Sequence, residues 1–130
     1  MGRFGIAFVV LIALVLSGCG VSGQRQTQGD LTVTLATNPP TPIVDRPTTF
    51  ELTLQRNGNP VDSAYVTLMR QMPGMRHNDE GRLVAESLGN GRYTAQSSFA
   101  MGSRWNVIVE VVIADAPPQA LTFAIEVDQP

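Results

Sequence analysis

The sequence predicts an all-β protein: a seven-stranded immunoglobulin-like antiparallel β-sandwich that follows an N-terminal signal segment. Three observations predict it. Short segments alternate between apolar and polar residues, clusters rich in Gly, Pro and Asn separate these segments, and no segment after the signal shows a convincing 3.6-residue period. Seven such strands in about 100 residues are typical of an immunoglobulin-like sandwich.

Residues 1–18 have the pattern of a bacterial lipoprotein signal peptide. Arg3 supplies a positive start, and the apolar run at 4–16 is shorter than the roughly 20 residues needed to cross a bilayer. The sequence Leu16-Ser17-Gly18-Cys19 then resembles a lipobox. It predicts cleavage before Cys19 and lipid on Cys19. The protein would be exported and anchored to the cell membrane or outer membrane, facing the periplasm or the exterior. The alternative is a short anchor helix with an incidental cysteine.

The rest of the chain divides into a tether and a domain. Residues 19–30, rich in Gly, Ser, Gln and Thr, are predicted to be the lipidated cysteine and a flexible tether. Residues 31–130 are predicted to be the folded domain. Cys19 is the only cysteine, so the domain has no internal disulfide and its core must hold by packing alone.

The predicted strands are short, and their faces can be assigned. The segment at 105–113 places apolar side chains at every second position, from Trp105 to Ile113, on one face of a strand. Residues 57–60 and 89–91 carry the turn chemistry of tight hairpins, and Tyr93 is predicted to be a corner tyrosine that bonds to backbone. The seven predicted strands are 31–35, 50–54, 65–69, 83–88, 93–99, 105–113 and 121–127.

Composition excludes several classes of function. The formal net charge is −2, and no basic patch of the kind that binds nucleic acid is present. All nine basic residues are Arg, so no lysine can form a Schiff base. One His and one Cys cannot build the usual zinc sites of hydrolases. We therefore expect a protein that is not an enzyme.

Methionines and the single histidine gather in one segment. Met72 and Met75 flank Pro73-Gly74, which marks a turn, and His77 follows two residues later. Thioether sulfur is a soft neutral donor that suits Cu(I), and imidazole also suits copper. This segment is a candidate Cu(I) site.

Chain topology adds a fourth ligand. When consecutive strands run in opposite directions, the first, third and fifth connections lie at one end of a sandwich. The Met/His segment is the third connection, and Met101 lies in the fifth. We therefore expect Met72, Met75, His77 and Met101 to share one end. The same argument predicts that the N-terminus enters at the other end and that the Met/His end faces away from the membrane.

A second interpretation of the same residues stays open. Methionine commonly fills irregular gaps in a core, and a single His is often a surface or capping residue. The loops would then belong to a metal-free interaction module that docks onto an envelope or membrane protein complex.

Three motifs in order resemble those of the YtkA-like family: 72–77 matches Met-Pro-x-Met-x-His, 89–95 matches Gly-x-Gly-x-Tyr-x-Ala, and 101–107 is similar to Met-x-Gly-x-Trp-x-Val. The resemblance covers roughly residues 30–127. One departure is Ser103: the family often has Gly nearer the Trp, but here two residues separate Gly102 from Trp105.

The resemblance implies an exported immunoglobulin-like domain related to FixH-type oxidase-assembly factors and CopC-like copper proteins. It implies copper handling, with Met72, Met75 and His77 in the Met/His motif and Met101 before the Gly-Trp segment. The implied partners are the membrane, through lipid on Cys19, and another exported copper protein or an oxidase-assembly component.

Overall fold

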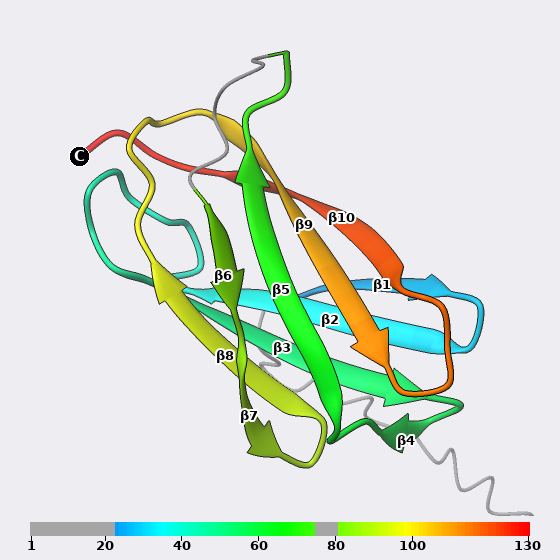
Figure 1. Cartoon of the computed structure of the whole chain (residues 1–130). Helices are drawn as coiled ribbons and strands as arrows, with labels where there is room; N and C mark the ends of the chain where they lie inside the picture. The colour runs from blue at the N-terminus through cyan, green and yellow to red at the C-terminus, as the bar shows by residue number, and fades with distance from the viewer. Residues whose placement is uncertain (1–22, 75–80) are drawn as a thin grey trace, which may run out of the picture.

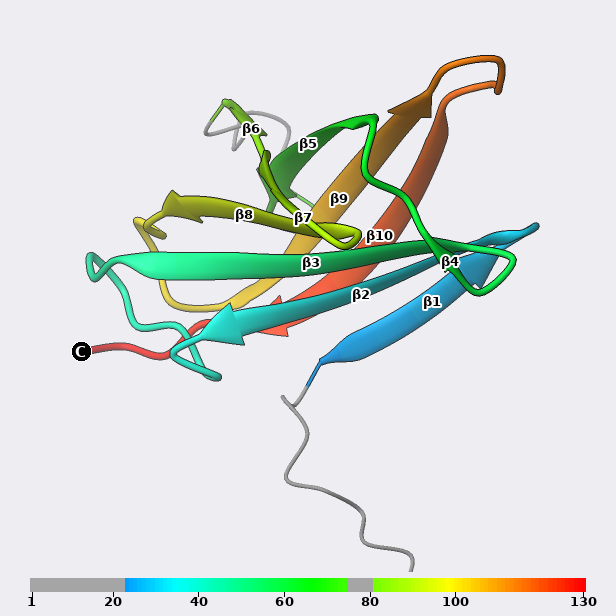
Figure 2. The ribbon, with the colours of Figure 1, turned by 90° about the horizontal axis from the view of Figure 1, so that it is seen from below.

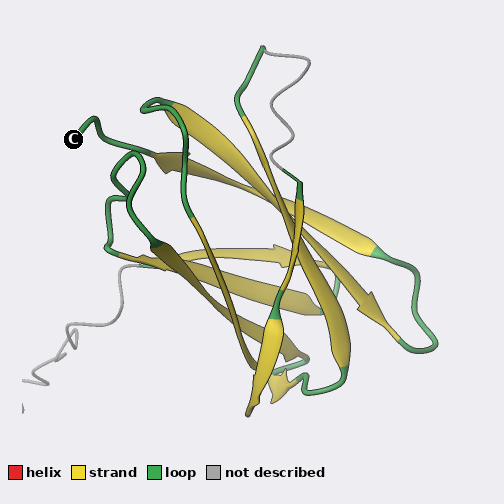
Figure 3. Ribbon diagram, turned by 60° about the vertical axis from the view of Figure 1, so that its left-hand side comes forward, coloured by secondary structure: helices red, strands yellow, loops and turns green. Residues whose placement is uncertain are grey.

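The computed structural model describes residues 23–74 and 81–130, and within these residues every regular element is a β-strand (Figures 1 and 3). No helix long and apolar enough to cross a membrane occurs among them. The strands are β1 (Gln24–Gln28), β2 (Leu31–Asn38), β3 (Thr48–Arg56), β4 (Asn59–Pro60), β5 (Ala64–Gln71), β6 (Arg82–Val84), β7 (Glu86–Gly89), β8 (Arg92–Ser97), β9 (Arg104–Ile113) and β10 (Gln119–Glu126).

The strands form two antiparallel sheets packed face to face, so the predicted sandwich is confirmed (Figure 2). One sheet has the order β1-β2-β3-β8-β7, with β4 paired to β3, and the other has the order β10-β9-β5-β6. This is the immunoglobulin arrangement of an ABED sheet on a CFG sheet. All seven predicted strands are present. The predicted fourth strand is divided into β6 and β7, and β1 and β4 are additional.

The division of the fourth strand ties the two sheets together at one edge. β6 pairs with β5 in one sheet, and β7 pairs with β8 in the other. Between them, the amide of Ala85 still donates to the carbonyl of Val66 at 2.9 Å. The chain therefore crosses from sheet to sheet with a single buried residue, Ala85, at the crossing.

The core lies between the sheets and follows the period of two. On β9, Trp105, Val107, Val109 and Val111 are buried, as predicted, and Ile113 packs half-buried at the edge of the core. The facing sheet contributes alternate residues of β2, β3 and β8. At about 25 cal/mol per Å² of apolar surface, this burial is the main source of stability in a domain without a disulfide.

The flexible tether predicted for residues 19–30 is wrong over Gln24–Gln28, which form strand β1. β1 pairs with β2 in register from Gln24 opposite Leu35 to Gln28 opposite Leu31. Its polar side chains also reach the second sheet. The amides of Gln24 and Gln26 donate to the carbonyls of Ala124 and Thr122 on β10, at 2.5 and 2.6 Å. The polar composition of this segment indicated a tether. In the structure its polar side chains instead cover the edge of β10, whose carbonyls would otherwise be exposed.

The predicted entry of the chain at the end opposite the Met/His segment is also wrong. Because β1 runs antiparallel to β2, the described chain starts beside Leu35 and Ala36, beyond the middle of β2. That position lies towards the end of β2 from which the first connection leaves. The strand that sequence reasoning missed therefore reverses the entry direction.

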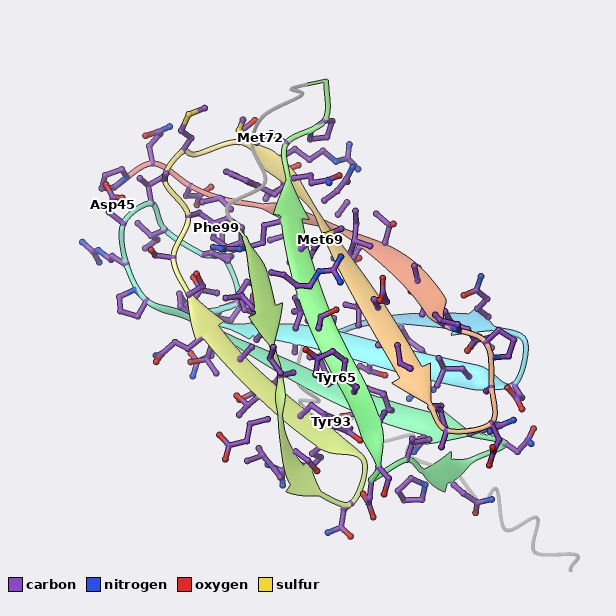
Figure 4. All side chains as sticks on the ribbon, viewed as in Figure 1. Asp45, Tyr65, Met69, Met72, Tyr93 and Phe99 are labelled. Carbon is purple, nitrogen blue, oxygen red and sulfur yellow. The ribbon has the colours of Figure 1, made fainter. Side chains whose placement is uncertain are left out.

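Tyr93 makes the backbone bonds predicted for it. Its ring is buried, its hydroxyl donates to the carbonyl of Val61 at 2.7 Å, and the same oxygen accepts from the amide of Ala64 at 3.1 Å. The side chain on β8 thus closes the link between β4 and β5 and joins the two sheets at the end opposite Met72 (Figure 4).

We predict that Tyr93→Phe lowers the free energy of unfolding by about 1–3 kcal/mol, because it leaves two backbone groups without their partner. Urea denaturation measures the change. Tyr65→Phe is the matched control, since Tyr65 is 56% exposed and should have almost no effect. Equal losses for both variants would contradict the role assigned to the Tyr93 hydroxyl.

A second prediction concerns β1. A chain that begins at Asp30 lacks the strand that pairs with β2 and the two amides that cover β10. It should unfold at lower urea concentration than a chain that begins at Gly23, with a loss of about 1–3 kcal/mol. Superimposable urea curves would show that β1 contributes nothing to the fold.

Candidate functional site

Three connections leave the strands at one end of the sandwich, as the order of strands predicted (Figure 1). The β2–β3 and β8–β9 connections touch, because the amide of Asp45 donates to the carbonyl of Phe99 at 2.9 Å. The β5–β6 connection begins at the same end with Met72 (Figure 4). The C-terminal segment joins them, since the amide of Val44 donates to the carbonyl of Asp128 at 3.0 Å.

The structure brings two of the predicted ligands to this end. Met72 directly follows β5, is half-buried and packs against the core. Met101 lies in the β8–β9 connection and is 44% exposed. Met75 and His77 lie outside the described residues, as does the predicted lipidation site, Cys19.

Met69 does not belong with them, although it is close to Met72 in sequence. It is on the outer face of β5, and its sulfur accepts a weak hydrogen bond from Arg82 on the neighbouring strand at 3.6 Å. Met72 follows three residues later, which is an odd step along an extended chain. Because Met72 packs against the core and Met69 does not, the two side chains lie on opposite sides of the sheet that contains β5.

An aromatic cluster supports this end from below. Phe99, fully buried, lies with its ring centroid 5.9 Å from that of Phe50 and 5.2 Å from that of Trp105. Phe50 comes from β3 and Trp105 from β9, so Phe99 contacts an aromatic ring from each sheet. The β8–β9 connection is thereby anchored in the core two residues before Met101.

The backbone of the β8–β9 connection is held by donors from several elements. The indole Nε1 of Trp105 donates to the carbonyl of Met101 at 3.0 Å. The amide of Val127 donates to the carbonyl of Ser103 at 2.9 Å. With the bond from Asp45, donors from three parts of the chain fix a segment that lacks regular secondary structure.

Arg70 is the residue at this end that sequence reasoning missed. It continues the inward-facing positions of Val66 and Leu68 on β5 and is only 3% exposed. Its Nη1 donates to the Ser97 hydroxyl at 2.7 Å and to the Ser98 carbonyl at 2.6 Å. Its guanidinium carbon also lies 5.8 Å from the centroid of the Phe99 ring. The period of two already placed position 70 inward, and that signal could have found it.

A hollow lies away from this end. It is an open pocket of about 280 Å³ on the outer face of the six-stranded sheet, and Glu51, Leu88 and Arg92 are among its lining residues. Neither Met72 nor Met101 lines it. This pocket therefore forms no part of the candidate site.

Comparison with known proteins gives the family. The profile of the YtkA-like family matches residues 25–110. The chain belongs to the YtkA-like family. The match begins within β1, so the strand that the sequence reading missed is part of the family's domain. It also spans all four predicted metal ligands. β10, which completes the second sheet, lies beyond the matched residues.

Two solved structures share the YtkA-like domain's fold. A protein of the DUF4426 family from Pseudomonas aeruginosa superposes with a TM-score of 0.57 at 18% identity, over 79% of this chain and 94% of that one. The soluble domain of PmoD from a Methylocystis species gives a TM-score of 0.56 at 12% identity, over 84% and 100%. At these identities the likeness shows the fold. No curated protein matches the chain in sequence.

The donors of this YtkA-like domain are soft. In residues 23–74 and 81–130, no three His, Cys, Asp or Glu side chains gather where they could hold a metal ion. Of the predicted ligands, the described part brings the thioethers of Met72 and Met101 to the loop end. Thioethers favour Cu(I) and bind hard divalent cations poorly. The donor set fits Cu(I) better than zinc, calcium or magnesium.

Proposed function

We propose that this YtkA-like domain is an exported binding protein that holds Cu(I) through Met72, Met75, His77 and Met101. One observation carries the proposal: Met72 and Met101 are distant in sequence, yet the fold brings both to the same end. Two thioethers on separate connections of one rigid sandwich are an arrangement that a soft ion can use.

The domain acts by binding and passing the ion and is not an enzyme. Its candidate partners are another exported copper protein or an oxidase-assembly component. A half-buried Met72 and a 44% exposed Met101 fit this role, because a carrier needs one donor that a partner can reach. Membership of the YtkA-like family supports copper handling, as its resemblance to CopC-like proteins implies.

Lipid on Cys19 would hold the domain at the membrane. Gly23, where the described chain starts, is four residues after Cys19, and four extended residues span at most about 14 Å. The domain would therefore stand close to the bilayer. Because β1 starts beside Leu35 and Ala36, towards the loop end of β2, this anchor would not hold the loop end away from the membrane.

A second function is favoured by a different surface. Tyr65 and Val84 are 56% and 58% exposed on adjacent strands, where Val84 pairs with Thr67 on β5. Large exposed apolar side chains on neighbouring strands are a feature of protein interfaces. In this reading the domain is a metal-free interaction module that docks onto an envelope or membrane protein complex.

We predict stoichiometric Cu(I) binding by the full-length protein under reducing conditions. Competition titration against a colorimetric Cu(I) chelator measures the affinity. Met101→Ala should weaken binding although it lies outside the Met/His segment, because the fold brings it to the same end. Zn(II) should bind much more weakly, since one imidazole cannot supply the three or four donors that zinc requires.

The control for this titration is Met69→Ala, which removes a thioether from the outer face of β5 and should leave the affinity unchanged. Equal and negligible Cu(I) uptake by the wild type and by the variant with Ala at all four ligand positions would refute the copper proposal. The interaction module would then stand in its place.

Cys19→Ser should leave an uncleaved precursor or a soluble exported form, because the lipid acceptor is lost. Detergent partitioning and the size on a denaturing gel measure this. If the variant partitions into detergent at the processed size of the wild type, the lipoprotein assignment is wrong.

A further inference from the structure

We infer that Arg70 and Trp105 are positioning residues: from inside the sandwich they hold the β8–β9 connection in the shape that presents the Met101 thioether at the end where Met72 lies. This inference rests on the proposed Cu(I) site for its purpose. The hydrogen bonds and burial that carry it are independent of any metal.

Arg70 links the two segments that carry the methionines. It precedes Met72 by two residues, and an even step along an extended chain places both side chains on the inner side. Met72 is indeed half-buried against the core. The guanidinium donates to the Ser97 hydroxyl and to the Ser98 carbonyl. Ser98 is three residues before Met101. One side chain therefore sets the position of the β8–β9 connection relative to the end of β5.

A buried cation at this place has a cost that core packing would avoid. Removing a guanidinium from water is unfavourable unless its donors are satisfied, and an apolar side chain of similar size is often as stable or more stable. Val66 and Leu68 show that β5 uses apolar residues at its other inward positions. Arg70 thus adds what an apolar residue cannot: directed bonds to the Ser97 hydroxyl at the end of β8 and to the Ser98 carbonyl, where the connection begins.

Trp105 fixes the residue that carries the ligand. It is 1% exposed at the start of β9, and its indole N–H donates to the carbonyl of Met101 itself. A buried indole needs such an acceptor, and here the acceptor belongs to the backbone of the proposed ligand. The backbone of Met101 is held from below, while its side chain remains 44% exposed.

The consequence is a donor that is ordered before the ion arrives. Asp45 and Val127 hold two further carbonyls of the same connection, those of Phe99 and Ser103. A ligand on a fixed backbone loses less conformational freedom on binding than one on a free loop, and affinity rises accordingly. Arg70 and Trp105 should therefore raise Cu(I) affinity without contacting the ion.

Two variants of the full-length protein test this. Arg70→Leu removes the directed bonds and adds no thioether. Trp105→Phe removes the N–H and keeps an aromatic ring beside Phe99. Arg92→Leu is the matched control, because Arg92 is exposed on β8. Amide hydrogen exchange of Asp45 and Val127, whose amides donate to carbonyls of the β8–β9 connection, and the NMR signal of the Met101 methyl group measure order without metal. Chelator competition measures Cu(I) affinity.

We expect amide exchange at Asp45 and Val127 to accelerate and Cu(I) affinity to fall, each by about tenfold, in both variants and not in Arg92→Leu. Exchange in β2 and β3 should stay as in the wild type, which separates loop positioning from global destabilisation. If Arg70→Leu does not fold, Trp105→Phe alone decides.

The outcomes separate the inference from the copper proposal. Wild-type exchange at Asp45 and Val127 together with a wild-type Met101 methyl signal in both variants overturns the positioning role, whether or not Cu(I) binds. Faster exchange with unchanged Cu(I) affinity overturns its link to the metal site. If the wild type takes up no Cu(I), the proposed function fails on its own, and the exchange and methyl data still decide whether Arg70 and Trp105 order Met101.

Discussion

The packing of Phe99 between the two sheets is the interaction on which the loop end depends. Its ring lies between Phe50 of one sheet and Trp105 of the other, and the guanidinium of Arg70 lies near the ring. Its carbonyl accepts from Asp45, so the β2–β3 connection is fixed by the same residue. Phe99 follows β8 and belongs to no strand. The β8–β9 connection thus places the large apolar side chain of Phe99 in the core. This fixes the position of the residues next to it, including Met101.

The edges of the sandwich are also held by contacts that join the two sheets. At one edge the chain itself crosses between the sheets at Ala85. At the other edge, Gln24 and Gln26 of β1 pair with one sheet through their backbone and bond to β10 through their side chains. At the end opposite Met72, the Tyr93 hydroxyl joins β8 to the β4–β5 link. Hydrogen bonds at the periphery thus supply the order that a disulfide supplies in many small sandwiches.

How much of this could be predicted from sequence depends on which signal each residue carries. The period of two predicted the core faces, because alternate residues such as Val107 and Val109 must be apolar where a sheet is half-buried. The order of strands predicted which connections lie at the same end. β1 escaped because its residues are polar on both faces, so its hydrogen bonds to β2 and β10 leave no apolar pattern. The buried position of Arg70 was not predicted, because a charged residue is not expected to face inward unless its hydrogen-bond partners, here Ser97 and Ser98, are known.

The candidate ligands also differ in whether sequence spacing or chain topology identifies them. A motif can bring Met72, Met75 and His77 to attention through spacing alone, but it cannot say that Met101 belongs with them; that follows from chain direction. The fold adds a distinction that no motif holds: Met69, three residues from Met72, lies on the opposite side of its sheet and bonds to Arg82. Of the described methionines near the loop end, Met72 is thus held by the core and Met101 by Trp105. A soft ion bound at that end would contact the half-buried thioether of Met72, which can retain it, and the exposed thioether of Met101, which can receive or release it. Because hydrogen bonds fix the backbone of Met101, the two thioethers would keep this difference in exposure.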